Sequence, residues 1–142
     1  MSLDVVVAML AISVTRATPL ALGALSGLMS ERAGVVNIAI EGIMLSGAFA
    51  GFLIGVYTHS LLLAVLGALA VGGLMALLHA LLSITFRVDQ IISGTVINIL
   101  AVGITGVYYR TFIQQQNVAG PGTLPVWKIP FLANLQIGRA HV

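Results

Sequence analysis

The sequence predicts an all-α, polytopic membrane protein: a transmembrane helix bundle with about four spans. Of its 142 residues, 59% are hydrophobic and only 7% are charged, whereas soluble domains carry about 25% charged residues. The mean hydropathy is +1.12. The apolar residues form four long runs, separated by short polar or glycine-containing breaks. Since about 20 apolar residues span the hydrocarbon core of a bilayer as a helix, each run is expected to cross the membrane.

The small positive charge does not indicate nucleic-acid binding. The formal net charge of +2 comes from six basic and four acidic residues, and these are scattered singly rather than gathered into a basic patch. Because the chain has no cysteine, disulfides and thiolate metal sites are excluded. The first residues, MSLD, contain no lysine or arginine. They are therefore unlike the basic start of a cleaved signal peptide, and the first run is expected to be retained.

The first predicted span covers residues 5–29 and contains Pro19. Splitting the run at Pro19 would leave two pieces that are each too short to cross, so we expect one helix with a kink there. Arg16 either faces the protein interior or anchors the helix at an interface. Gly23 and Gly27 have a small-xxx-small spacing, which allows another helix to approach closely.

A charged break follows at residues 30–34, SERAG, where Glu31 and Arg32 stand between a serine and a glycine. These residue types are typical of a helix end. The second predicted span covers residues 35–57, and its start is the most unusual stretch of the chain. Asn37 and Glu41 lie inside the apolar run, four residues apart and therefore on one helix face.

An ionisable side chain at membrane depth is costly unless it faces protein or water, so Glu41 is a functional-site hypothesis. The alternative is that Glu41 lies near the bilayer surface and only caps or tethers a helix. A re-entrant or broken segment near Asn37–Glu41 is compatible with this pattern, because irregular backbone is tolerated where it lines a cavity. Gly47, Gly51 and Gly55 form a ridge on the flank of this face, and ordinary helix packing is the simplest explanation for them.

The third predicted span covers residues 61–86, after a short turn that exposes His59. His79 is its strongly polar side chain. On such a helix a lone histidine is more often hydrogen-bonded to a neighbouring helix than used as a ligand or proton carrier.

The polar break RVDQ, residues 87–90, precedes the fourth predicted span at residues 91–109. Thr95, Asn98 and Thr105 follow one stripe of this helix. The stripe either faces Asn37 and Glu41 and completes a polar pathway, or joins the helices by ordinary hydrogen bonds.

Residues 110–135 are expected to form a loop, because hydrophobicity falls and prolines and glycines accumulate. Residues 1–135 are interpreted as one transmembrane domain. The last residues, 136–142 (QIGRAHV), match one reading frame of a common sequencing adapter and are interpreted as a non-native tail.

Two blocks carry a resemblance to a known family. They are PLALGALSGLMSERAGVVNIAIEGIMLSGAFAG, residues 19–51, and RVDQIISGTVINILAVGITG, residues 87–106. Both resemble the permease subunits of bacterial ABC importers for purine nucleosides and simple sugars, which are related to the branched-chain amino acid and ribose permeases. The blocks occur in the family's order and at a plausible separation, so the resemblance covers most of the chain. It implies that residues 1–135 are the N-terminal part of a transmembrane permease domain.

The resemblance implies transport by alternating access in the bacterial cytoplasmic membrane. It implies ATP-binding cassette subunits, a second permease subunit and an extracytoplasmic substrate-binding protein as partners. Permeases of this kind contact the ATPase through a loop that lies beyond the end of this chain. The chain alone is therefore not expected to transport. Lysine and arginine counts at the two membrane sides are tied, and the resemblance implies an outward N-terminus.

The residues themselves exclude several enzyme classes. The chain has no P-loop, since its one lysine is Lys128 in VWKIP, and it has no HExxH or GxSxG motif. ATP must therefore be handled elsewhere, and the resemblance implies a permease subunit without enzymatic activity and without a cofactor, with ATP hydrolysis in separate cassette subunits. A substrate pathway is expected at Asn37, Glu41, Thr95 and Asn98. The alternatives are a branched-chain amino acid permease and a channel or structural membrane subunit that needs no ATPase.

Overall fold

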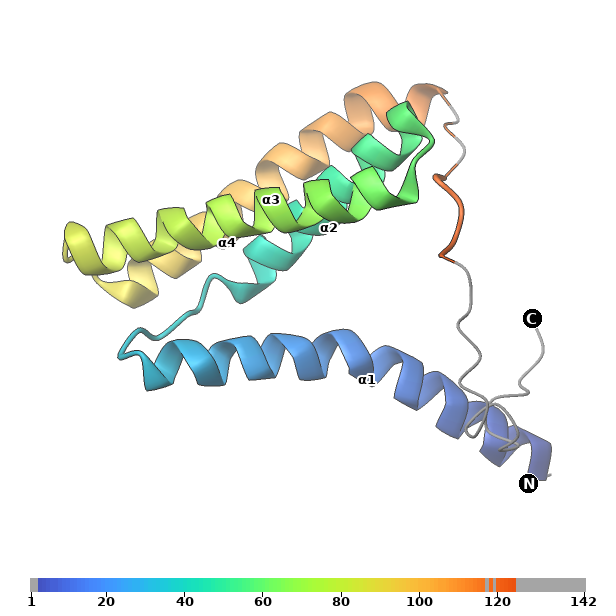
Figure 1. Ribbon diagram of the computed structural model, residues 1–142, viewed down its shortest axis with the longest axis horizontal. Coiled ribbons are helices and arrows are strands. Elements are labelled where there is room, and N and C mark those ends of the chain that lie inside the picture. Colours follow the sequence, from blue (N-terminus) through green and yellow to red (C-terminus); the bar gives the residue numbers. More distant parts are fainter. Residues whose placement is uncertain (1–2, 117, 119, 125–142) are drawn as a thin grey trace. The chain divides into compact units, whose positions relative to one another are not determined.

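The computed structural model describes residues 3–116, 118 and 120–124, and this part of the chain is helical without any strand. It contains four helices that are long and apolar enough to cross a membrane, so the predicted all-α fold class is confirmed. In order, the elements are α1 (Leu3–Arg32), α2 (Ile40–Thr58), α3 (Leu61–Ala80), η1 (Leu81–Thr85), α4 (Gln90–Tyr108), η2 (Tyr109–Ile113) and η3 (Gln114–Gln116) (Figure 1).

The contacts divide the described residues into two units, one that holds α1 as far as Ala24 and one that begins at Leu25 and ends at Thr123. In the first unit, α1 passes through Pro19 as one helix. The hydroxyls of Thr15 and Thr18 donate to carbonyls one turn earlier, at 2.8 and 3.1 Å. Back-bonds of this kind and the missing proline amide both favour bending, which is the physical basis for the predicted kink.

The end of α1 is set by a glycine at the predicted charged break. Gly34 has φ +83°, a left-handed conformation that favours glycine. Its amide donates to the carbonyl of Glu31 at 2.9 Å, and the Val35 amide donates to the carbonyl of Ser30 at 3.0 Å. This pair of bonds is the Schellman motif, which satisfies the last carbonyls of a helix. The helix therefore stops at Arg32, with Glu31 and Arg32 exposed in its last turn.

In the second unit, α2 packs along both α3 and α4 (Figure 1). The ridge of Gly47, Gly51 and Gly55 is buried and lies against α3. A Cβ at Gly47 would lie 3.0 Å from the Ala68 carbonyl oxygen, and one at Gly51 would lie 3.1 Å from that of Ala64. The two backbones thus approach so closely that only glycine fits without adjustment.

The two glycines predicted to allow close approach on the first span lie in different surroundings. A Cβ at Gly27, in the last part of α1, would lie 3.1 Å from the Ile40 side chain. Gly23 is half-buried. Gly27 therefore marks a close approach between the end of α1 and the start of α2.

In these helices polar side chains are buried and large apolar side chains are exposed, the reverse of the pattern in a soluble protein. The buried polar side chains among the described residues are His79, Ser83, Ser93 and Thr105, whereas large apolar side chains on all four helices are exposed. A lipid-facing surface requires apolar residues, and polar groups in a bilayer are held inside the protein. The distribution therefore supports a membrane-embedded bundle.

Two boundaries differ from those expected. The second helix begins at Ile40 rather than at residue 35, because residues 33–39 are not helical. The fourth helix does not stop at Tyr109 but continues as helical turns to Gln116, so the loop expected from residue 110 begins later. Aromatic packing supports this extension. The centroid of the Tyr108 ring lies 5.6 Å from the centroid of the Phe49 ring and 4.7 Å from that of the Phe112 ring. Residues 117, 119 and 125–135 of the expected loop, and the tail at 136–142, lie outside the described residues.

Candidate functional site

The candidate site is the non-helical segment that precedes α2. Irregular backbone at membrane depth needs partners for its amides and carbonyls, because lipid offers none. Side-chain carboxamides from three residues supply such partners. The Gln90 Oε1, at the start of α4, accepts from the Val36 amide at 2.6 Å. Asn37 closes a local turn, since its Oδ1 accepts from the Ala39 amide at 3.1 Å.

Asn98 is the third of these residues, and it connects α4 to the start of α2. Its Nδ2 donates to the Ile38 carbonyl at 2.9 Å, and its Oδ1 accepts from the Gly42 amide at 2.7 Å. The first amides of a helix have no partner inside the helix, and Ala39 at the N-cap provides no side-chain cap. Asn98 therefore caps α2 from a neighbouring helix.

Two buried glycines make this contact possible. A Cβ on Gly42 would lie 2.7 Å from the Asn98 Oδ1 and 2.9 Å from its Cα. A Cβ on Gly94, one turn earlier on α4, would lie 2.9 Å from both the Ala39 amide nitrogen and the Ile38 Cβ. These distances are shorter than real Cβ atoms show. The backbone of α4 and the segment before α2 thus meet at a place with no room for a side chain from either side. We call residues 36–42 together with Gly94 and Asn98 the α2 junction.

Glu41 lies in the first turn of α2, next to Gly42 of the junction. Its side chain is exposed. The partial positive charge of a helix N-terminus stabilises a carboxylate at this position. The junction therefore presents an acidic group at the point where α2 begins.

The structure brings the predicted site residues together only in part. Asn37 and Asn98 both hold the junction, and Glu41 adjoins it. Thr95 is exposed, and its hydroxyl donates to the Ile91 carbonyl at 2.8 Å. Thr95 is rotated by about 60° from Asn98 around the helix, whereas Thr105 is only about 20° away. Accordingly Thr105 is buried and Thr95 is not.

Sequence reasoning did not single out Gly42, Gly94 or Gln90. A glycine inside an apolar run is a signal for close backbone approach, but the chain has 16 glycines. Nothing in the sequence separates these two from glycines such as Gly103, where an added Cβ would meet nothing within 4 Å.

His79 takes the structural role considered first for it. Its Nδ1 lies 3.1 Å from the Ser93 Oγ on α4, and the two side chains are 2% and 3% exposed. This buried bond joins α3 to α4 beside Gly94.

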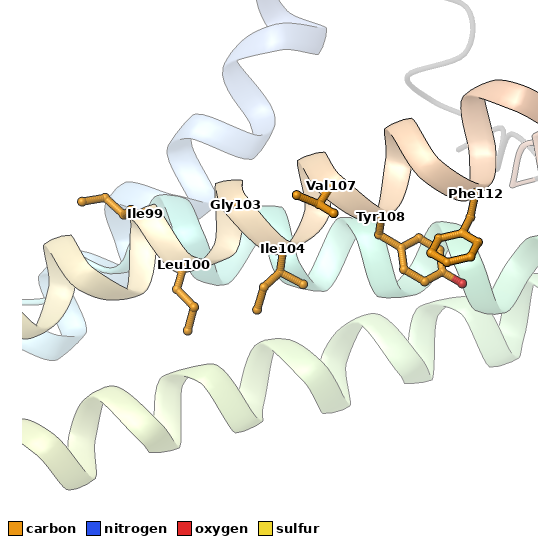
Figure 2. A pocket seen from close by; sticks show the side chains of 7 residues that line it. All are labelled: Ile99, Leu100, Gly103, Ile104, Val107, Tyr108 and Phe112. Atoms are coloured by element: carbon orange, nitrogen blue, oxygen red, sulfur yellow. The ribbon is translucent and has the colours of Figure 1, made fainter.

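An apolar pocket of about 550 Å³ lies along the exposed face of α4 (Figure 2). Apart from the Tyr108 hydroxyl, its side chains have no hydrogen-bonding group; they are Ile99, Leu100, Ile104, Val107, Tyr108 and Phe112, with Gly103 between them. A hydroxyl-rich solute needs polar partners, so this surface suits acyl chains or another apolar helix rather than a polar substrate. Among the described residues no cluster of three or more His, Asp or Glu side chains could hold a metal ion.

Four apolar helices, with buried polar side chains between them, are the features of a multi-pass membrane protein. The chain belongs to the family described as branched-chain amino acid transport system / permease component, which matches residues 9–135.

Three curated relatives of the chain are permease proteins of ABC transporters. The chain is 47% identical over 95 residues to the guanosine ABC transporter permease protein NupQ of Bacillus subtilis, covering 63% of this chain and 30% of the relative. It is 32% identical over 126 residues to the nucleoside ABC transporter permease protein NupC of Lactococcus lactis, covering 84% and 40%. It is 36% identical over 115 residues to the putative glucose ABC transporter permease protein TsgC13 of Haloferax volcanii, covering 80% and 35%. The chain thus spans 30–40% of the length of these relatives. No solved structure matches it.

Proposed function

We propose that the chain is the N-terminal part of the membrane-spanning permease subunit of an ATP-driven ABC importer, which translocates nucleosides or simple sugars by alternating access. The observation that carries this proposal is the family match over residues 9–135. Relatives named as guanosine, nucleoside and glucose permeases support the substrate class.

The α2 junction supports a pathway for a neutral, hydroxyl-rich solute. Asn37 and Asn98 use their carboxamide groups on backbone partners, so we assign them the task of holding the break open at the start of α2. Glu41 then offers a carboxylate that accepts hydrogen bonds from substrate hydroxyls, and charged acceptors form the stronger hydrogen bonds. Thr95 is retained as an outer position of the same pathway, because its side chain is exposed.

The proposed partners follow from the family and from the named relatives, which are permease components of ABC transporters. ATP is hydrolysed by separate ATP-binding cassette subunits, in keeping with the lack of a P-loop in this sequence. A second permease subunit completes the membrane part, and an extracytoplasmic binding protein delivers the substrate. The location is the cytoplasmic membrane of a bacterium.

A branched-chain amino acid permease is the second candidate, because the family description itself names that substrate class. An amino acid zwitterion presents an ammonium and a carboxylate, for which a site would be expected to offer both charges. The junction offers one carboxylate and no lysine or arginine, which favours the nucleoside or sugar assignment.

Substrate-dependent ATPase activity separates the candidates. The full-length permease, reconstituted with its cassette subunits, second permease and binding protein, is expected to hydrolyse ATP faster when a nucleoside or simple sugar is added. Leucine, isoleucine and valine should leave the rate at its basal value. Stimulation by the amino acids alone would replace the proposal by the second candidate, and ATPase-independent flux of solutes would replace it by a channel.

Glu41→Gln in the full-length permease is expected to lower uptake about tenfold while membrane insertion stays intact. The substitution keeps the side-chain shape but removes the charge, and hydrogen bonds to charged groups are worth about 1–2 kcal/mol more than neutral ones, where about 1.4 kcal/mol is tenfold in affinity. Uptake of labelled substrate into cells or vesicles gives the readout. Glu31→Gln, at the exposed end of α1, is the matched control and should transport normally. Uptake by Glu41→Gln equal to that of the parent would remove Glu41 from the site.

A further inference from the structure

A buried polar cluster lies between α3 and α4, outside the proposed substrate pathway. It consists of His79 near the end of α3, Ser83 in the π-helical turn that follows, and Ser93 on α4. Their side chains are 2%, 8% and 3% exposed. The Nδ1 of His79 and the Oγ of Ser93 are 3.1 Å apart, which accounts for one ring nitrogen and one hydroxyl.

Two polar atoms of the cluster are left over. The Nε2 of His79 and the Oγ of Ser83 are both buried, and neither has a hydrogen-bond partner in the described part of the chain. A buried polar atom without a partner is costly and uncommon, and a bound water is a frequent explanation for one. The cost is not relieved in a bilayer, where the surroundings provide no donor or acceptor.

The spacing of the two residues suits a partner that they share. His79 and Ser83 are four residues apart, a spacing that places two side chains on one helix face with Cβ atoms about 5–6 Å apart. Ser83 also belongs to a π-helical turn, Leu81–Thr85; single π turns of this kind are frequent at functional sites.

We propose that His79 Nε2 and Ser83 Oγ bind one ordered water in the protein interior. Water both donates and accepts, so it satisfies Nε2 in either neutral tautomer and satisfies the serine hydroxyl at the same time. The bound water holds the imidazole ring in the orientation in which Nδ1 meets Ser93. Ser93 precedes Gly94, whose backbone lies against Ile38 and Ala39. The water is therefore part of what positions α4 against the α2 junction, and His79 and Ser83 are positioning residues.

Solid-state NMR of the full-length permease in bilayers tests this directly. With ring-¹⁵N histidine, the His79 signals are assigned by their loss in His79→Gln, and magnetisation transfer from water identifies hydrated nitrogens. The expected result is a water cross-peak at the His79 Nε2, weakened or lost in Ser83→Ala with a shift of the Nε2 resonance. Ser30→Ala is the matched control, because the Ser30 hydroxyl donates within α1, to the Ser26 carbonyl. A dry Nε2 in the parent would overturn the proposal.

The sign of a stability change gives a second, independent readout. If Ser83 Oγ shares a water, Ser83→Ala removes one of the water's partners and lowers the unfolding midpoint. If the hydroxyl had no water partner, the same substitution would remove an unpaired buried polar group and raise the midpoint of unfolding. A raised or unchanged midpoint for Ser83→Ala would contradict the water site.

Discussion

Asn98→Leu is expected to destabilise the bundle by about 2–6 kcal/mol and to abolish uptake. The substitution leaves the Ile38 carbonyl and the Gly42 amide without the partner that now lies at 2.9 and 2.7 Å. A backbone group that loses its partner away from water costs about 1–3 kcal/mol, and at membrane depth, where lipid offers no replacement, two such groups lose their partner together. Thermal unfolding in detergent or nanodiscs and uptake by the full-length permease are the measurements.

A paired variant separates the two bonds. Asn98→Asp keeps an acceptor for the Gly42 amide but loses the donor to Ile38 and brings an ionisable group to membrane depth, which is costly, so it should be less stable than the parent. Ile99→Val, at an exposed neighbouring position, should leave stability within about 0.5 kcal/mol. If Asn98→Leu unfolded at the same temperature as Ile99→Val, Asn98 would not be the cap of α2.

Gly94→Ala is expected to destabilise the protein by about 1–3 kcal/mol, the usual cost of overpacking. The new Cβ would lie 2.9 Å from the Ala39 amide nitrogen and from the Ile38 Cβ, so α4 must move away from the segment that precedes α2. Uptake should fall with stability, because the move separates Asn98 from its two backbone partners. Thermal unfolding and uptake are again the measurements.

Gly103→Ala on the same helix is the control, and it should stabilise the protein rather than destabilise it. An added Cβ there meets nothing within 4 Å, and replacing glycine by alanine inside a helix favours the helix by about 0.5–1 kcal/mol. Equal unfolding temperatures for the two alanine variants would mean that α4 does not approach the junction as closely as the structure has it.

The fold class followed from the sequence because it depends on composition and length. Four apolar runs separated by polar breaks predict four helices whatever their packing, and Gly34 marked the end of α1 through a backbone conformation that favours glycine. The break before α2 was expected from Asn37 and Glu41 within an apolar run. The length of this break was not predicted, because the helix start at Ile40 depends on Asn98. This residue lies 56 residues from Gly42 in the sequence.

The sequence predicted which helix face carries the candidate site residues, but not which residues of other helices they contact. Periodicity placed Thr95, Asn98 and Thr105 on one stripe of α4, but only the packing of α4 against α2 decides which edge of that stripe is covered. Thr95 lies on the uncovered edge. The glycines of the junction were missed for the same reason, since a glycine's importance depends on what its missing side chain would touch.

The reactivity of a thiol placed at position 41 tests the proposed pathway most directly. This chain has no cysteine, so Glu41→Cys introduces a single thiol into this region, and thiols react as thiolates, which form in water rather than in lipid. In the reconstituted importer we predict that a charged, water-soluble thiol reagent labels the Glu41→Cys variant fast, and that a saturating nucleoside or sugar slows this labelling several-fold. The Ile99→Cys variant, on the apolar face of α4, should stay unlabelled. Labelling at position 41 that is as slow as at position 99, and unaffected by any solute, would contradict a substrate pathway at the start of α2.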